Sequence, residues 1–168
     1  MKHETERDRV ADKLQSFKRL VATFSVAALV LDLATKAWAR KSLPSPDGFQ
    51  LSPSLALRPR YNDGTMFGLL SGSTTLNFTI LGTATLLVIV VLVRWAVYAK
   101  RRWITLGASL MATGALGNLI DRLIVGMVTD FVDVHVGSWG LPIFNLADIW
   151  MVVGLFLVLL DSRNTEGE

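Results

Sequence analysis

Residues 76–93 read LNFTILGTATLLVIVVLV, eighteen consecutive residues without a charged side chain. A helix needs about 20 apolar residues to cross the hydrocarbon core of a bilayer, with about 17 as the lower limit. Residues 103–120 form a second uncharged run of this length, and residues 143–160 form a third whose single charge is Asp148. These runs predict an α-helical membrane protein.

The composition is also that of a membrane protein. Hydrophobic residues make up 51% of the 168 residues, charged residues only 18%, and the mean hydropathy is +0.44. Soluble domains carry roughly 25% charged residues, so both a soluble enzyme and a disordered chain are excluded. The pI near 9.5 is typical of nucleic-acid binding. The net charge is only +3, however, and a bilayer explains where the basic residues lie, so no nucleic-acid partner is expected.

The first apolar stretch, residues 20–31, is shorter and is followed by Asp32 and Lys36. A short apolar stretch followed by Ala37-Trp38-Ala39 is compatible with a cleaved signal peptide. The spacing of Asp32 and Lys36 is instead i and i+4 with the acid first, the favourable order for an ion pair on a helix. We therefore expect a retained span over about residues 20–39, which this pair holds against the other spans.

Four spans, at about residues 20–39, 76–97, 103–121 and 143–160, then form one domain over residues 1–168. Eleven of the 17 Lys and Arg residues lie on the side of the two termini. Positive residues favour the cytoplasm, so we expect a cytoplasmic tail over residues 1–19 and a cytoplasmic C-terminus. The outer loops are residues 40–75, expected to hold a small sheet or an interfacial helix, and residues 122–142. In the second loop, alternation over Val132–Val136 before a glycine-rich turn predicts a short hairpin.

Several aspartates fall at the outer boundary of these spans. Ionisable residues beside a membrane are costly, so each is a functional hypothesis. Asp121 ends the third span, Asp130 lies in the following connection, and Asp148 is expected about 7.5 Å inside the fourth span. Two carboxylates that meet share a proton, so one can take a proton from water while the other donates to a carbonyl oxygen. Such a pair cleaves an amide with no thiol, metal or cofactor, and the chain has no cysteine and two histidines.

Five short motifs occur in order over residues 32–148. They are DLATK at 32–36, YNDGTMFG at 61–68, GALGNLIDR at 114–122, VTDF at 128–131 and FNLAD at 144–148. Together they resemble lipoprotein signal peptidase (signal peptidase II), the aspartic membrane peptidase of bacteria. One departure is Thr65-Met66, where small residues are common in the family.

The resemblance implies a specific reaction and site. The family removes the signal peptide of prolipoproteins before a diacylglyceryl-modified cysteine, in the cytoplasmic (inner) membrane, with the active site near the extracytoplasmic face. Asp130 and Asp148 match its catalytic aspartates, and loop 40–75 matches its sheet cradle and interfacial helix. Residues expected to shape the site or contact substrate are Asn62, Gly64, Asn118, Asp121, Arg122 and Asn145. Of these, Asp121 and Arg122 are expected to orient the site or to form a buried ion pair, and Asp32 and Lys36 to be structural.

Prolipoproteins and membrane lipids are the expected partners, and one chain is expected to suffice. Two alternatives stay open at this point: a non-catalytic relative that binds lipoproteins, and a small proton-coupled transporter. The transporter is disfavoured because the acids cluster at one face and the inner halves of the spans carry none. The preferred prolipoproteins, a lid role for residues 40–75, and the roles of Asp133 and His135 are left open.

Overall fold

The computed structural model describes residues 2–63, 75–137 and 139–163. Within these residues, four helices and four strands follow one another in this order: α1 Lys2–Ser42, β1 Phe49–Ser52, β2 Leu55–Asn62, α2 Thr75–Tyr98, α3 Arg102–Val125, β3 Val128–Val136, β4 Trp139–Gly140 and α4 Leu146–Arg163. Gly64 and the segment expected to hold an interfacial helix lie outside the described residues.

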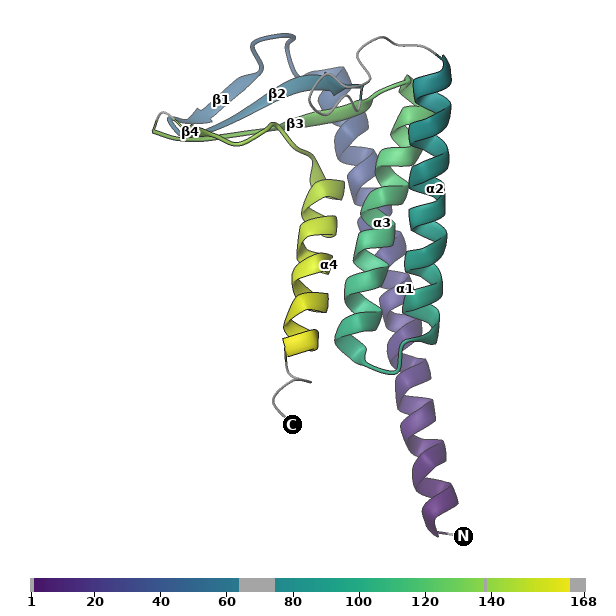
Figure 1. Cartoon of the computed structure of the whole chain (residues 1–168). Helices are drawn as coiled ribbons and strands as arrows, with labels where there is room; N and C mark the ends of the chain where they lie inside the picture. The colour runs from purple at the N-terminus through teal and green to yellow at the C-terminus, as the bar shows by residue number, and fades with distance from the viewer. Residues whose placement is uncertain (1, 64–74, 138, 164–168) are drawn as a thin grey trace.

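The helices form a bundle with α3 at its centre, because α1, α2 and α4 all pack against α3. The sheet caps one end of this bundle and overhangs α4 (Figure 1). The first turn of α1 and the last turn of α4 both lie at the opposite end (Figure 1). The described motif residues of the outer loops therefore gather at one end of the molecule.

Helix α1 is much longer than the predicted first span. It starts at Lys2, so the expected tail over residues 1–19 is helical almost throughout. The tail is rich in good helix formers, and neither glycine nor proline occurs before Pro44. Proline disfavours a helical conformation in the residue before it, which explains why α1 ends at Ser42.

Helix α4 begins three residues later than the predicted fourth span. The backbone of Phe144 exchanges hydrogen bonds with β3: its N–H donates to Val132 O at 3.1 Å, and its carbonyl accepts from the Val132 N–H at 2.8 Å. A residue held in a ladder cannot also belong to a helix, so α4 starts at Leu146. Asp148 consequently lies in the first helical turn and not about 7.5 Å inside the span.

The sheet has strand order β1-β2-β3-β4, with every neighbouring pair antiparallel. The sheet expected in residues 40–75 is present as β1 and β2, and the chain extends it with β3 and β4. The predicted hairpin is confirmed, since His135 pairs with Gly140 and Val136 with Trp139. Gly137 makes this turn with φ 64°, a conformation that glycine adopts without strain. The sheet thus joins both outer loops into one structure.

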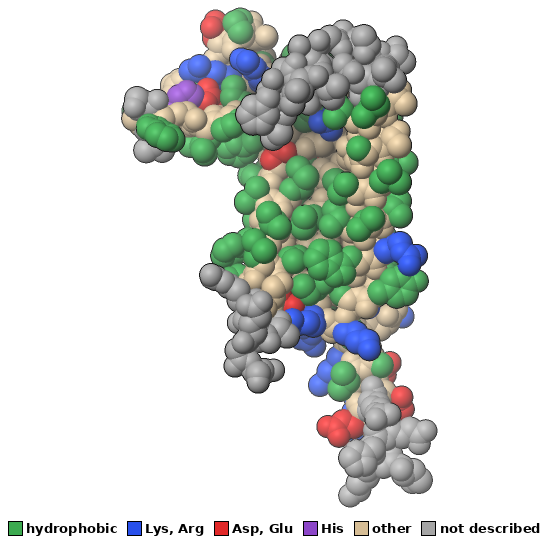
Figure 2. All heavy atoms as spheres, viewed as in Figure 1, with side chains coloured by type: hydrophobic (Ala, Val, Ile, Leu, Met, Phe, Trp, Pro, Cys, Tyr) green, Lys and Arg blue, Asp and Glu red, His purple; other side chains and the backbone are tan. Residues whose placement is uncertain are grey.

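Burial in the bundle is inverted relative to a soluble protein. The largest fully buried side chains are all polar: Lys36, Asn145, Thr129, Asp32 and Asp121. Large apolar side chains face outward, and Figure 2 shows them over the length of the bundle. Among the described helices, α1 over Asp8–Ser42, α2 over Thr79–Tyr98 and α3 are long and apolar enough to cross a membrane. Such a surface is stable only in contact with lipid, so this is a helical membrane fold with a small sheet.

Glycines allow α3 and α4 to approach closely, as small residues commonly do between membrane helices. A Cβ at Gly107 would lie 2.6 Å from Gly154 O, and one at Gly114 would collide with Ala147 O. A Cβ at Gly117 would collide with the carboxylate of Asp32 on α1. These glycines therefore set the distance between the helices that carry the motifs.

Gly107→Ala is expected to lower the unfolding temperature of the purified protein in detergent. The added methyl group forces the α3–α4 backbones apart, and overpacking of this kind costs about 1–3 kcal/mol. Gly82→Ala on α2 is the matched control, because its Cβ would be 4.0 Å from its nearest neighbour, Leu119 Cδ1. Equal unfolding temperatures for the two variants, followed by tryptophan fluorescence, would contradict the close packing.

Candidate active site

Asp130 sits on β3, where the sheet meets the bundle. Its side chain is 3% exposed and is held by two amides. Asn145 Nδ2 donates to its Oδ1 at 2.6 Å, and Asn62 Nδ2, from β2, donates to its Oδ2 at 3.1 Å. Strand pairing between β2 and β3 and the turn into α4 therefore fix this carboxyl from both sides.

Asp148 is fixed by the start of α4. Its backbone N–H donates to Asn145 Oδ1 at 3.1 Å, and its own Oδ2 accepts the Asn145 backbone N–H at 3.1 Å. This reciprocal pair is the geometry of a capping box. The half-buried carboxylate lies at the positive end of the helix, where a negative side chain is stabilised.

Asn145 and Asn118 connect the two carboxyl groups. Asn145 Nδ2 also donates to Asn118 Oδ1 at 3.2 Å, and Asn118 Nδ2 donates to Asp148 Oδ1 at 3.0 Å. Asp130, Asn145, Asn118 and Asp148 thus form one continuous hydrogen-bonded chain. The structure brings these four predicted site residues together from three elements.

A buried ion pair on α1 supports this chain from below. Lys36 Nζ donates to Asp32 Oδ2 at 2.8 Å and to Asn118 Oδ1 at 2.7 Å. An ammonium group has only donors, so it must face the amide oxygen of Asn118 and leave the Nδ2 group for Asp148. Asp32 Oδ1 in turn accepts the Ala147 N–H of α4 at 2.9 Å. The pair therefore ties α1 to both α3 and α4.

Asp121 finds its ionic partner on α1, not in the neighbouring Arg122. Its Oδ1 accepts from Arg40 Nη1 at 2.5 Å, and its Oδ2 accepts from the Thr129 N–H at 2.6 Å. Arg40 Nη1 also donates to Thr129 Oγ1 at 2.9 Å. This cluster anchors β3 one residue before Asp130. Arg122 Nη1 donates to the Asn118 carbonyl at 3.4 Å, so Arg122 borders the site without pairing to Asp121.

The two carboxyl groups have different electrostatic surroundings. Burial is the main cause that raises the pKa of Asp130 from its ordinary value to about 6, and the negative charge of Asp148 adds to this rise. The amides of Asn62 and Asn145 oppose it, because they donate to the ionised form. Asp130 therefore retains a proton over a pH range in which an ordinary aspartate is ionised.

A cleft of about 560 Å³ opens beside Asp130 along the sheet. Asn62, Asp133 and His135 line it together with the backbone leading into α4. His135 Nδ1 lies 2.9 Å from Asp133 Oδ1, so these two residues form a contacting pair on the wall of the cleft. Of the two carboxyl groups, Asp130 lines this cleft directly.

The sequence missed two supports of the site, Arg40 and Thr129, and one acid outside it, Asp161. Arg40 and Lys36 lie one helical turn apart on α1, but nothing in the sequence showed that Arg40 would reach Asp121. Thr129 lies inside the motif at 128–131, but only the folded structure shows that it contacts Asp121 and Arg40. Asp161 is a further acid, at the opposite end of α4, where it pairs with Arg101 at 2.9 Å. Among the described residues, no group of three or more His, Asp or Glu side chains is arranged to hold a metal ion.

The family model described as signal peptidase (SPase) II matches residues 24–163. The chain belongs to the signal peptidase II family. Its members are peptidases, so membership favours neither the transporter nor the non-catalytic alternative.

Curated relatives agree with this assignment. The lipoprotein signal peptidase of Sinorhizobium fredii is 38% identical over 84% of this chain and 85% of its own length. The protein of the same name from Hydrogenovibrio crunogenus is 36% identical over 90% and 89%. A solved bacterial membrane enzyme, determined by the in meso method at 2.3 Å resolution, superimposes with a TM-score of 0.76. It is 28% identical to this chain, and the match covers 86% of this chain and 88% of that one.

Lys36→Met is expected to destabilise the protein and to lower its turnover. It leaves the buried carboxylate of Asp32 without a counter-charge, and breaking a buried pair costs about 3–5 kcal/mol. It also frees the amide of Asn118 to rotate away from Asp148. Thermal unfolding in detergent measures the first effect, and Lys41→Met, an exposed lysine on the same helix, is the control.

The double variant Asp32→Asn with Lys36→Met tests the ionic origin of that loss. It removes both charges, so part of the stability should return. A double variant less stable than Lys36→Met alone would show that the two residues act independently.

Proposed function

We propose that this protein is a lipoprotein signal peptidase of aspartic type, with Asp130 and Asp148 as its catalytic residues. The hydrogen-bonded chain from Asp130 through Asn145 and Asn118 to Asp148 carries the proposal. It supports two carboxyl groups in unequal surroundings beside a cleft, which is what amide hydrolysis by an aspartate pair requires. The substrate class, prolipoproteins, follows from the relatives' name, lipoprotein signal peptidase. Cleavage before the diacylglyceryl-modified cysteine is what the resemblance of the five motifs implies.

The unequal surroundings suggest a division of roles. Asp148, at the positive end of α4, takes a proton from water, and the resulting hydroxide adds to the scissile carbonyl carbon. Asp130, which holds its proton up to about pH 6, donates to the carbonyl oxygen. Collapse of the tetrahedral intermediate breaks the C–N bond, the proton on Asp148 passes to the leaving amine, and one hydroxyl of the intermediate returns its proton to Asp130 as the new C=O bond forms. Neither a metal nor a cofactor takes part.

The remaining site residues have supporting roles in this proposal. Asn62 and Asn145 hold Asp130, Asn118 orients Asp148, and Asp121 positions β3 through Thr129. Arg122 lies in the motif that contains Asn118, and Gly64 lies in the motif that contains Asn62. Both are assigned to substrate contact. Asp32 and Lys36 serve the site by fixing Asn118 and the start of α4.

We further propose that α1 to α4 all span the bacterial inner membrane within one domain over residues 1–168. The surplus of Lys and Arg at the helix ends opposite the sheet supports cytoplasmic termini. The catalytic pair Asp130 and Asp148, called the dyad below, then lies near the extracytoplasmic face. A secreted precursor arrives at this face while its lipid remains in the bilayer. One chain supplies every residue of the hydrogen-bonded chain, which supports a monomeric enzyme.

Asp130→Asn and Asp148→Asn are each expected to abolish cleavage, by at least about a thousandfold, because each removes an acid–base group. The assay follows the gel shift of a prolipoprotein in detergent, with and without its diacylglyceryl cysteine. Only the lipidated form should be cut. Asp47→Asn, an exposed aspartate in the outer loop, is the control for the substitution itself. Full activity in either dyad variant would remove that residue from the mechanism.

The pH profile gives a second test. If Asp130 must carry a proton, kcat/KM should fall as the pH rises through about 6. Asn62→Ala removes an amide that stabilises the ionised carboxylate, so the pKa of Asp130 rises and the alkaline limb should move to higher pH. Tyr61→Phe on the same strand leaves that amide in place and should not move the limb. A limb that stays in position in Asn62→Ala would contradict the role given to Asp130.

A further inference from the structure

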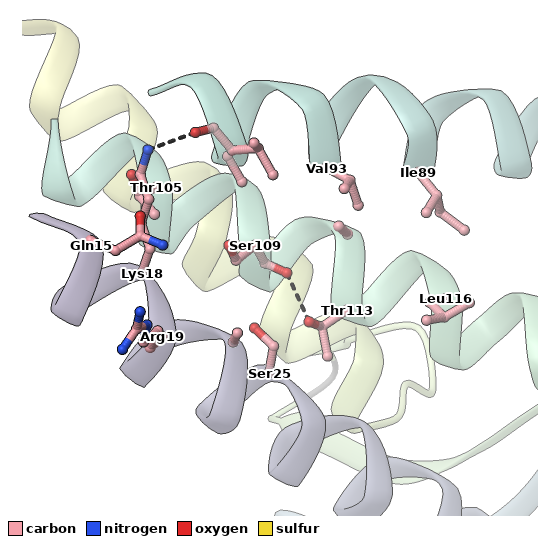
Figure 3. A pocket seen from close by; sticks show the side chains of 14 residues that line it. Gln15, Lys18, Arg19, Ser25, Ile89, Val93, Thr105, Ser109, Thr113 and Leu116 are labelled. Atoms are coloured by element: carbon pink, nitrogen blue, oxygen red, sulfur yellow. Dashed lines mark hydrogen bonds between the residues drawn. The ribbon is translucent and has the colours of Figure 1, made fainter. Parts of the chain in front are cut away.

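A second cavity, of about 520 Å³, lies on the side of α3 away from α4 and toward the end of the bundle opposite the sheet. Helices α1 and α2 form its walls and α3 its floor, as Figure 3 shows. Both wall helices pack on α3 and scarcely on each other, so a groove between them opens toward the surrounding bilayer. No residue of the dyad or of its supports lines this groove.

The length of the groove matches one leaflet. On α3, whose predicted span begins at about residue 103, it extends from Thr105 to Leu116, which is about 17 Å at 1.5 Å per residue. The hydrocarbon core of a bilayer is about 30 Å thick, so the groove covers about half of it. Its deeper part is walled by Ile89, Val93 and Leu116. This part has the shape and polarity for an acyl chain.

The outer end of the groove is positively charged. Lys18 and Arg19 line it beside Gln15, and its described lining contains no carboxylate. Lys18 Nζ donates to the Val97 carbonyl at 2.6 Å, which holds this ammonium at the rim between α1 and α2 (Figure 3). Because the partner is a neutral carbonyl, no carboxylate of the described lining competes with an outside anion for this ammonium.

One polar group inside the groove lacks a partner. The hydroxyl oxygen of Ser25 is buried without a hydrogen bond, and Ser25 lies on α1 across the cavity from Thr113 (Figure 3). Thr113 Oγ1 is already used, since it donates to the Ser109 carbonyl at 2.8 Å. Ser25 lies deeper than Lys18 by about 10 Å, the order in which a phospholipid presents its ester carbonyl below its phosphate.

We propose that this groove is a binding site for an anionic phospholipid of the bilayer. The phosphate binds at Lys18 and Arg19, and an ester carbonyl accepts a hydrogen bond from the Ser25 hydroxyl. One acyl chain fills the apolar part against Val93 and Leu116. The site is separate from the proposed peptidase site and does not depend on the reaction assigned there. Its ligand is a resident lipid and is not consumed.

Native mass spectrometry of the full-length protein in detergent tests the proposal, with equal amounts of dioleoyl phosphatidylglycerol and dioleoyl phosphatidylcholine added. Wild type should retain the anionic lipid preferentially. Removing two cations near an anionic headgroup is worth roughly thirtyfold in affinity, so Lys18→Gln with Arg19→Gln should lose most of the preference. Arg9→Gln with Lys13→Gln makes the same charge change outside the groove and should keep it.

A steric test checks the acyl chain without any change in charge. Val93→Trp fills the groove and should reduce phosphatidylglycerol binding at least about tenfold, while Val91→Trp on the outer face of α2 should not. This pair decides the question if the double charge variant does not fold. Equal retention of the two lipids by wild type, or equal binding by the two tryptophan variants, would overturn the proposal.

Discussion

The buried ion pair between Lys36 and Asp32 is the interaction on which the rest of the site depends. Both side chains are at most 1% exposed and lie 2.8 Å apart. In a low-dielectric interior such a pair persists only when every remaining donor and acceptor is satisfied. Here Asp32 accepts a hydrogen bond from the Ala147 N–H, and Lys36 donates one to the Asn118 side-chain oxygen. Charge satisfaction on α1 thus holds the first turn of α4 against α1 and sets how the Asn118 amide is turned.

That constraint extends to the reacting groups. Because the Asn118 oxygen faces Lys36, its Nδ2 group faces Asp148. Because Asp32 holds the first turn of α4, Asn145 is positioned to cap that turn and to reach Asp130 with its amide. Each hydrogen bond in the chain therefore has one possible direction. Preorganisation of this kind removes the need to reorient dipoles during the reaction.

The lipid bilayer around the helices explains both the polar interior and the exposed apolar surface. In a bilayer, apolar side chains gain nothing by facing one another, so helices associate through close backbone packing and polar contacts. The glycines of α3 and the ion pair of α1 supply these two kinds of contact. The groove between α1 and α2 is the region where the helices do not close on each other, which leaves space there for lipid.

Much of the architecture was predictable because membrane spans and turns are local. The apolar runs indicated α2 and α3, alternation before a glycine-rich turn indicated the β3–β4 hairpin, and the i and i+4 spacing predicted the pairing of Asp32 with Lys36. The motifs also named all four residues of the hydrogen-bonded chain. Helix ends were predicted less well. The tail before residue 20 is helical, and α4 begins later than predicted because Phe144 pairs with β3.

The contacts between distant segments were decided only by the tertiary structure. Arg40 pairs with Asp121 across 81 positions, and residues of β2 and β3 meet because strand pairing joins two outer loops. Composition and local periodicity do not predict contacts between segments that are far apart in the sequence. The sequence by itself determined a helical membrane protein with its motif aspartates at one end and with Asp32 paired to Lys36. Only folding decided that Asp121 meets Arg40, because that depends on how four helices and a sheet are packed in three dimensions.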